Sequence, residues 1–371
     1  MKYLKFITSL LAIGCFLHPA IFGQAKVGTT GAQFLDISPS VQAIGMGEAA
    51  AATTVHSAFY NNPASLGLIG IKRVAKLSFF PVKAKFPAGT GLQNYEFSAP
   101  VYSSSTGNIL QSVSFGIYHT RLVSAEMIER DYDRLPTGRT YQYNSSVTNL
   151  SCSYAYLSTV QFSVGITMKS IDESANEYSS SGSAMDIGLL FRYPIFKNYT
   201  DIGSSYNLYM IPAIGFSLRN YGPDMEFNTN KYPLPKSRAL GLAYEFGLRN
   251  FVDTRRELDA FRILLALEFD YKHGGTEQHN IGTEISLYEL FNIRLGQINF
   301  NENSNKQNTL GFSLSTDRIG KFLLLTNGGV TNSRFLEFIT EKLSLEYNYA
   351  IKSNNYFDDI TYHELVLSYH L

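Results

Sequence analysis

Ionisable residues recur at alternate positions along several segments of the chain. They are Asp186, Arg192, Arg219, Glu245, Arg262, Glu268, Asp270, Glu284, Arg294, Glu346 and Glu364. Two carboxylates that share a cavity can act as general acid and general base. The signs here are mixed, however, which favours a water-filled interior held together by ion pairs. We therefore expect these residues to line a lumen rather than to catalyse a reaction.

Two further motifs could bind a cofactor or a metal. Gly45 to Ala50 fits the glycine fingerprint of dinucleotide sites, but that chemistry needs a preceding strand and a following helix, and neither flank supplies one. His273, Glu277 and His279 give an incomplete metal ligand set, and Gly274-Gly275 between them is typical of a hairpin loop. No nucleophile elbow, phosphate loop or HExxH motif is present. We expect no cofactor, no metal and no enzymatic activity.

Elements with two unlike faces must position the charged residues. From Val74 onward, apolar and polar residues alternate with a period of two, which is typical of strands. One apolar row is Ile263, Leu265, Leu267, Phe269 and Tyr271, opposite Arg262, Leu264, Ala266, Glu268, Asp270 and Lys272. The apolar rows carry no charge, as a lipid-facing wall requires, because Arg or Lys near the bilayer midplane costs about 2–4 kcal/mol. A soluble β-sandwich also alternates, so alternation by itself leaves both classes open.

The number and spacing of the segments favour an all-β transmembrane antiparallel β-barrel of about 14 strands. The predicted strands are 72–86, 93–103, 109–122, 141–157, 160–172, 181–194, 206–219, 237–248, 260–273, 279–288, 291–301, 307–315, 341–352 and 361–371. Single-chain barrels have an even number of strands and long loops on one side. The links 123–140, 173–180 and 220–236 obey this rule, whereas 249–259 and 316–340 break it. Phe322 to Leu325 could form an extra strand in the last link.

Composition agrees with a membrane barrel in an exported protein. The chain has 25 Tyr and 26 Phe, which could form aromatic girdles although Trp is absent. The net charge of zero gives no sign of a nucleic-acid partner. Residues 1–23 resemble a signal peptide, with Lys2 and Lys5 before an apolar run and cleavage expected after Gly23 or Ala25. The mature chain then holds a single cysteine, Cys152, so no internal disulfide can form.

Between the signal peptide and the strands lies a segment rich in glycine and alanine, residues 24–70. Gly45, Gly47, Asn61, Asn62 and Pro63 suit a compact irregular structure packed against other backbone, since glycine permits close approach and proline restricts its own φ and its predecessor. We expect this segment to be a plug in the lumen of a barrel formed by residues 71–371.

The same segment carries a family resemblance. Ala32 to Leu35, Val41 to Ala49 and Phe59 to Leu66 resemble the N-terminal signature of the PorV/PorQ family, within the group of outer-membrane barrels similar to FadL. That family usually has Trp or another aromatic before a single Asn-Pro-Ala, whereas Tyr60 here precedes a double Asn. Weaker agreement continues through 185–190, 280–284 and 345–350.

The resemblance implies a non-enzymatic component of type IX protein secretion in the bacterial outer membrane, in contact with lipid, exported cargo proteins and other secretion components. The expected cargo-contact residues lie in two loops and are Met127, Tyr132, Tyr221, Met225, Phe227 and Tyr232. These aromatics could instead fold back over the barrel mouth. The alternative function is FadL-like passive transport of long-chain fatty acids or other hydrophobic small molecules, with a lateral gap at Pro100. A simple bulge would equally explain a proline there.

Overall fold

The computed structural model describes residues 30–55, 57–69, 73–86, 89–107, 109–130, 133, 135–175, 178–199, 206–251, 257–273, 277–300, 306–326, 338, 342–353 and 358–371. The predicted signal peptide, residues 1–23, lies outside this part of the chain. Among the described residues, no helix is both long enough and apolar enough to cross a membrane.

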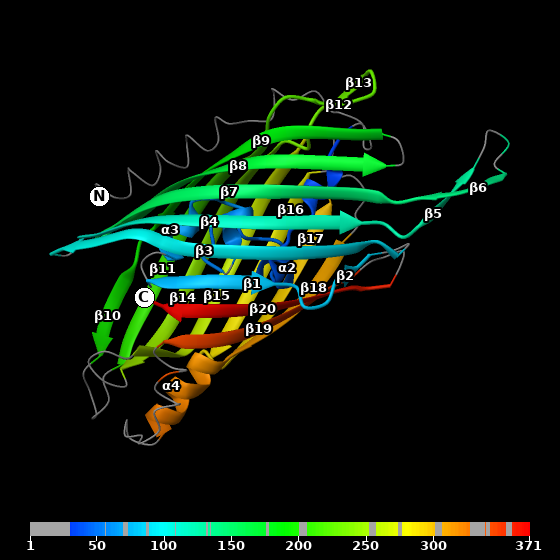
Figure 1. The fold of residues 1–371 in the computed structure, drawn as a ribbon. Coiled ribbons are helices and arrows are strands. Elements are labelled where there is room, and N and C mark those ends of the chain that lie inside the picture. The colour runs from blue at the N-terminus through cyan, green and yellow to red at the C-terminus, as the bar shows by residue number, and fades with distance from the viewer. Residues whose placement is uncertain are drawn as a thin grey trace.

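Fourteen antiparallel strands form one closed barrel (Figure 1). The strands are β1 (Val74–Phe79), β3 (Gly91–Thr106), β4 (Ile109–Val123), β7 (Tyr143–Leu157), β8 (Gln161–Ala175), β9 (Tyr178–Arg192), β11 (Tyr206–Tyr221), β14 (Ser237–Phe251), β15 (Glu257–Lys272), β16 (Gln278–Leu287), β17 (Phe291–Phe300), β18 (Lys306–Ser315), β19 (Leu343–Lys352) and β20 (Ile360–His370). The sheet closes because β1 pairs with β20 on one side and with β3 on the other. Closure leaves no exposed edge, which a sheet in lipid requires.

Short elements extend the barrel at its two ends. β2 (Ala84–Lys85) pairs with β3, and β10 (Ile195–Tyr199) pairs with β11. Two hairpins, β5–β6 (Met127–Arg130 and Pro136–Tyr141) and β12–β13 (Met225–Phe227 and Asn230–Tyr232), project from one end, which we call the loop end (Figure 1). The helix α4 (Thr316–Thr326) lies at the other end, the α4 end.

The predicted fold class is confirmed, and each of the fourteen predicted segments overlaps one barrel strand. The suggested extra strand at Phe322 to Leu325 is wrong, because these residues belong to α4. Ile319, Phe322 and Leu323 have the spacing of one helical face, and the Phe322 ring lies 5.3 Å from that of Tyr288. The link 249–259 is also shorter than predicted, since strands extend to Phe251 and from Glu257.

The outer wall is divided into an apolar band and a polar rim. Ile117, Leu150, Met168 and Met185 form one row across β4, β7, β8 and β9. The next row toward the loop end is polar and comprises the half-buried His119 and the exposed Thr148, Ser170 and Ser183. Toward the α4 end the rows stay largely apolar as far as the aromatic row of Tyr156, Phe162 and Phe191.

The aromatic border of this band is typical of a membrane barrel. Met168 and Phe162 are six residues apart on β8, which corresponds to about 20 Å along the tilted strand. The outward apolar band of membrane barrels is flanked by aromatic residues at the membrane interfaces. The aromatic row marks one border, where the Phe162 and Phe191 ring centroids lie 4.8 Å apart. The wall therefore has the arrangement of a lipid-facing surface with the loop end protruding.

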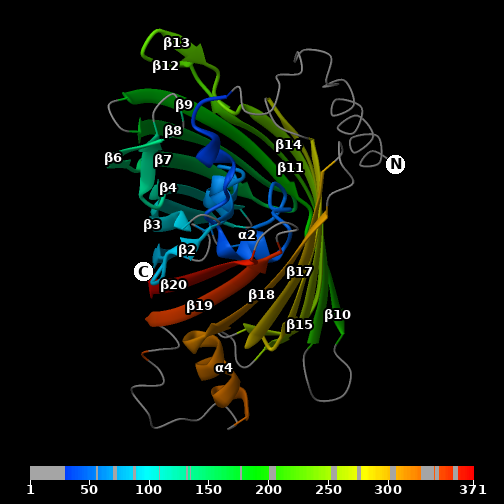
Figure 2. The same ribbon diagram turned by 90° about the vertical axis from the view of Figure 1, so that its right-hand side faces the viewer.

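Residues 30–55 and 57–69 lie inside the barrel, and we call them the plug (Figure 2). Their short helices are η1 (Gln33–Asp36), α2 (Val41–Gly45), η2 (Ala58–Tyr60) and α3 (Ser65–Ile69). Ser40 caps α2, its side chain accepting a hydrogen bond from the Ala43 backbone N–H. α2 contacts β17, β18 and β19, whereas α3 contacts β4, β7 and β8 on the opposite wall. The plug thus reaches across the lumen.

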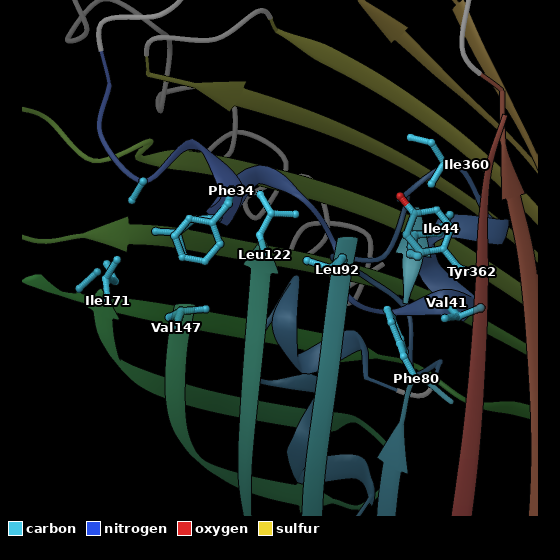
Figure 3. Packing of buried hydrophobic residues seen from close by; sticks show 14 of the residues in the cluster. Phe34, Val41, Ile44, Phe80, Leu92, Leu122, Val147, Ile171, Ile360 and Tyr362 are labelled. Carbon is cyan, nitrogen blue, oxygen red and sulfur yellow. The ribbon is translucent and has the colours of Figure 1, made fainter. Parts of the chain in front are cut away.

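Apolar side chains bury the plug at two levels. At the loop end, Phe34, Val41 and Ile44 of the plug pack among Leu92, Leu122, Val147, Ile171 and Tyr362 of the wall (Figure 3). A second cluster, nearer the α4 end, joins Met46, Ala49, Ala52, Ala58, Ala64 and Leu68 to Ala155, Leu157, Leu190, Ala243, Leu264 and Ala266. The polar contacts described next lie between these two clusters or at their borders.

Candidate functional site

Inward-facing glycines of the barrel form a seat for the plug backbone. They are Gly165, Gly188, Gly215, Gly241, Gly282, Gly296 and Gly311. A Cβ atom at Gly215 would lie 1.9 Å from the carbonyl oxygen of Ala51, and one at Gly296 would lie 2.0 Å from the backbone nitrogen of Gly47. Because the opposing atoms are backbone, no rotamer change could relieve either clash. The plug therefore lies directly on the backbone of the strands.

The Asn-Asn-Pro motif forms one fixed point of this seat. The Asn62 side-chain amide donates to the carbonyl oxygens of Ala51 and Leu189 at 2.6 and 3.0 Å, and its oxygen accepts from the Ala64 N–H at 3.0 Å. Pro63 lies over Gly165, where an added Cβ would be 2.4 Å from its carbonyl carbon. Asn62 thus joins two plug segments to β9.

A single barrel carboxylate holds the middle of the plug. Glu268 Oε2 on β15 accepts hydrogen bonds from the backbone N–H groups of Ala50 and Ala51 at 2.8 and 2.7 Å. Arg219 balances the charge, since its Nη2 lies 4.0 Å from Glu268 and 2.7 Å from Asp270. Hydrogen bonds to a charged acceptor are about twice as strong as neutral ones. Glu268 is thus a strong anchor for Ala50 and Ala51, whose methyl side chains cannot form hydrogen bonds.

Further side chains anchor the rest of the plug. Gln42 on α2 donates to Glu346 at 2.8 Å and to Asn348 at 3.0 Å. Near the loop end, the Ala32 N–H donates to Glu173 at 2.9 Å. On the opposite wall, the Ser163 hydroxyl donates to the Ala64 carbonyl at 2.7 Å. Hydrogen bonds to several strands therefore fix the plug.

Two lysines of the barrel pair with carboxylates of the plug. Lys352 Nζ lies 2.8 Å from Glu48, and Lys272 Nζ lies 3.7 Å from Asp36. Burial alone would raise the pKa of the Glu48 carboxyl, but the ammonium groups of Lys352 and Lys272 outweigh it and hold the pKa below its ordinary value. Glu48 is thus the plug carboxylate that is stabilised as an anion.

The structure places the charged residues singled out in the sequence on the lumen side, and it brings most of them together in pairs. Arg219 pairs with Asp270, Arg192 with Glu245 at 3.0 Å, and Glu284 with both Arg262 and Arg294. Asp186 pairs with Lys169 at 2.7 Å, and Glu364 accepts from Asn348 at 3.1 Å. Most of the charged residues singled out in the sequence are thus held in ion pairs of opposite sign within the described part of the barrel.

Sequence reasoning missed Glu173, Lys169, Lys272 and Lys352 as plug or lumen contacts. The signal was available for all four, because each stands at an inward position in the alternation of its strand, and Lys272 lies in the polar row opposite Ile263 to Tyr271. Among the described residues, no group of three or more His, Cys, Asp or Glu side chains could hold a metal ion.

Two small cavities lie between plug and wall, each of about 10 Å³. The first is lined by Leu35, Asp36, Ser38, Glu48, Tyr60, Asn61, Lys169, Arg219, Asn220, Ser237, Glu268, Asp270, Lys272 and Asn280. The second is lined by Ala52, Thr53, Thr54, Arg192, Ile211, Ala213, Ala243, Glu245 and Leu264. A cavity of this size holds about one water molecule. Neither could accommodate a hydrophobic molecule larger than that.

The residues expected to contact cargo do not share one exposed surface. Met127 is exposed on β5, whereas Tyr132 lies outside the described residues. Met225 is fully buried in the loop-end cluster, and a Cβ at Gly182 would lie 2.9 Å from its Cγ. Tyr221, Phe227 and Tyr232 are half-buried, with the rings of the last two 5.9 Å apart. The β12–β13 hairpin therefore folds over the barrel mouth, because Met225 gains more from burial than from exposure.

Pro100 lies at a bulge of β3. Its ladder with β4 continues on both sides, with a register shift between Pro100 and Tyr102. On the other side, the described ladder with β1 comprises four pairs and ends at Ser98. The break in pairing near Pro100 is thus limited to the side that faces β1.

No protein-family model and no curated protein matches this sequence. Among solved structures, the toluene transporter TodX of Pseudomonas putida covers 94% of this chain and 98% of its own, at 9% identity and a TM-score of 0.41. The toluene transporter TbuX of Ralstonia pickettii covers 90% and 97%, at 11% identity and a TM-score of 0.42. The transport unit of the autotransporter AIDA-I from Escherichia coli covers 80% and 90%, at 8% identity and a TM-score of 0.35. Structures this distant carry no argument about function, which is therefore inferred from the strand register and from the contacts of the plug.

Proposed function

We propose that the protein is an exported outer-membrane barrel, freed of its signal peptide, that serves without enzymatic activity in a type IX, PorV/PorQ-like secretion system. The observation that supports this function is the filled lumen. The plug contacts opposite walls, and the two cavities beside it each hold about one water. A barrel closed in this way performs its function at its ends and on its outer surface.

The loop end offers a surface for exported cargo. The β5–β6 hairpin pairs with no other described strand, and Ile128 and Leu135 on it are 54% and 60% exposed. Exposed apolar side chains on a projecting hairpin suit protein recognition. The cargo and the other secretion components would therefore meet this hairpin, while lipid surrounds the apolar band.

One observation favours a second candidate, FadL-like transport of fatty acids or other hydrophobic molecules. The β1–β3 ladder ends at Ser98, and Phe97 on β3 pairs with Ile117, which lies at the border of the apolar band. Among the described residues, β3 therefore has no partner in β1 beyond Ser98. This unpaired stretch of the β1–β3 seam lies within the apolar band, where unpaired backbone is unusual. A hydrophobic molecule could enter from lipid at this seam.

Photo-crosslinking in cells separates the two functions. A crosslinking residue at Ile128 is expected to capture exported proteins that share a C-terminal domain, whereas the same residue at the lipid-facing Ile187 is expected to capture none. Ile128→Asp is expected to weaken cargo binding by about tenfold, as for a moderate interface hot spot. Thr229→Asp, at an exposed position of the other hairpin, is the matched control. Co-purification of fatty acid or hydrocarbon with no protein crosslinked at Ile128 would favour transport and overturn the secretion proposal.

A further inference from the structure

The two cavities lie in line along one wall of the barrel. Inward residues of β11, β14 and β15 form cross-strand rows, and the first cavity touches the rows that contain Arg219, Asp270 and Glu268. The second cavity touches the rows next toward the α4 end, which contain Ala213, Ala243 and Ala266, and then Ile211, Glu245 and Leu264. Adjacent rows are about 7 Å apart. The cavities are thus separated by little more than one row.

The separating row is Gly215, Gly241 and Glu268, and Ala50–Ala52 of the plug covers it. Gly215 pairs with Gly241, and Gly241 pairs with Glu268. Because Gly215 and Gly241 have no side chains, the wall leaves space in the lumen at the position of this row. The plug fills it, since a Cβ at Gly241 would lie 2.7 Å from the Ala52 nitrogen. We call Ala50–Ala52 the latch.

Each cavity reaches toward a different end of the barrel. The Asp36 side chain, at the loop-end side of the first cavity, is 32% exposed. Thr54, in the second cavity, is half-buried, as are Arg192 and Glu245. Within the described residues, the latch is therefore the barrier between the two cavities.

We propose that this strip is a gated passage for water and small hydrated ions, closed by the latch and held shut by Glu268. Its lining carries both signs, with Asp36, Glu48 and Glu268 facing Arg219 and Lys272 around the first cavity. Paired charges stabilise hydrated ions of either sign, so selectivity would be weak. The inference does not depend on which partner the loop end binds.

Opening requires only a local movement. The latch is anchored to the wall by Glu268 and to Asn62 through the Ala51 carbonyl. The remainder of the plug has separate anchors, including Gln42 with Glu346, and Lys352 with Glu48. Releasing Glu268 would therefore remove the hydrogen bonds from the latch amides to the wall while the rest of the plug stays in the barrel. Arg219 would keep Asp270 as its partner at 2.7 Å.

Conductance across planar lipid bilayers in potassium chloride tests the passage with the whole protein. Wild type is expected to be closed, and Glu268→Ala to raise the conductance at least tenfold. Glu245→Gln is the matched control, because Glu245 lines the same strip but its described partner is Arg192 of the wall rather than the plug. This control is expected to remain as closed as wild type. Heat-modifiable migration in gels verifies that each barrel is folded.

Gly241→Val provides an independent variant, because it displaces the latch with Glu268 intact. Should Glu268→Ala not fold, Gly241→Val is expected to give the same increase in conductance. A folded Glu268→Ala or Gly241→Val barrel that stays as tight as wild type would overturn the proposal.

Discussion

Gly296→Val is expected to unseat the plug and to lower the free energy of unfolding by about 3 kcal/mol, at the upper end of the cost of overpacking. The Cβ would meet the Gly47 nitrogen at 2.0 Å and the Met46 carbonyl carbon at 2.3 Å. Both are backbone atoms of the plug, so the chain must move away from β17. Limited proteolysis should then cut residues 41–69 while the strands stay resistant, and denaturant titration should report the loss of stability.

Ala213→Ser is the matched control for this change. Ala213 also faces inward, but it lines the second cavity, which has room for one added hydroxyl group. Its stability and protease resistance should stay close to those of wild type. Were both variants equally stable and equally resistant, the plug could not be seated on the glycines.

Ile166→Arg is expected to destabilise the folded barrel in lipid by about 2–4 kcal/mol, the usual cost of arginine near the midplane of a barrel wall. Ile166 is exposed on β8, one row below the border of the apolar band. Ser170→Arg, four residues along the same strand and beyond that border, should cost only about 0–1 kcal/mol. Folding titrations into lipid vesicles measure both values. Equal costs at the two positions would indicate that the band does not face hydrocarbon.

The barrel was predictable because alternation is local. Successive residues of a strand face opposite sides of the barrel wall. The outward position of Ile166 and the inward position of Glu268 therefore follow from the alternation in the sequence. The helix α4 was harder, because Phe322 to Leu325 is a short apolar run that fits a strand or a helix equally well. Its contact with Tyr288 on a distant link decides the outcome.

The plug seat was predictable only in part. Gly45, Gly47 and the Asn-Asn-Pro motif indicated close backbone packing, and glycines within strands often mark such approaches. Which glycine meets which plug residue depends on strand register and on the path of the plug, and neither is encoded locally. The same limit holds for the contacts of charged residues. The alternation along β15 places Glu268 inward, but it does not reveal that Glu268 accepts hydrogen bonds from the N–H groups of Ala50 and Ala51.

The loop residues show a further limit of sequence reasoning. Met225 and Met127 are both apolar residues in polar loops, yet one is buried and the other is exposed. The difference arises because β12–β13 folds onto the plug, where the Gly31 N–H donates to the Pro233 carbonyl at 3.0 Å. The β5–β6 hairpin pairs only with itself among the described strands. Exposure in loops thus depends on tertiary contacts that composition does not specify.

Hydrogen–deuterium exchange of the intact protein in lipid nanodiscs tests most directly whether a seated plug closes a membrane-spanning barrel. The account predicts that the Ala50 and Ala51 amides, which donate to Glu268, exchange as slowly as amides in the middle of the strands. Rapid exchange throughout residues 41–69, beside strands that remain protected, would contradict it.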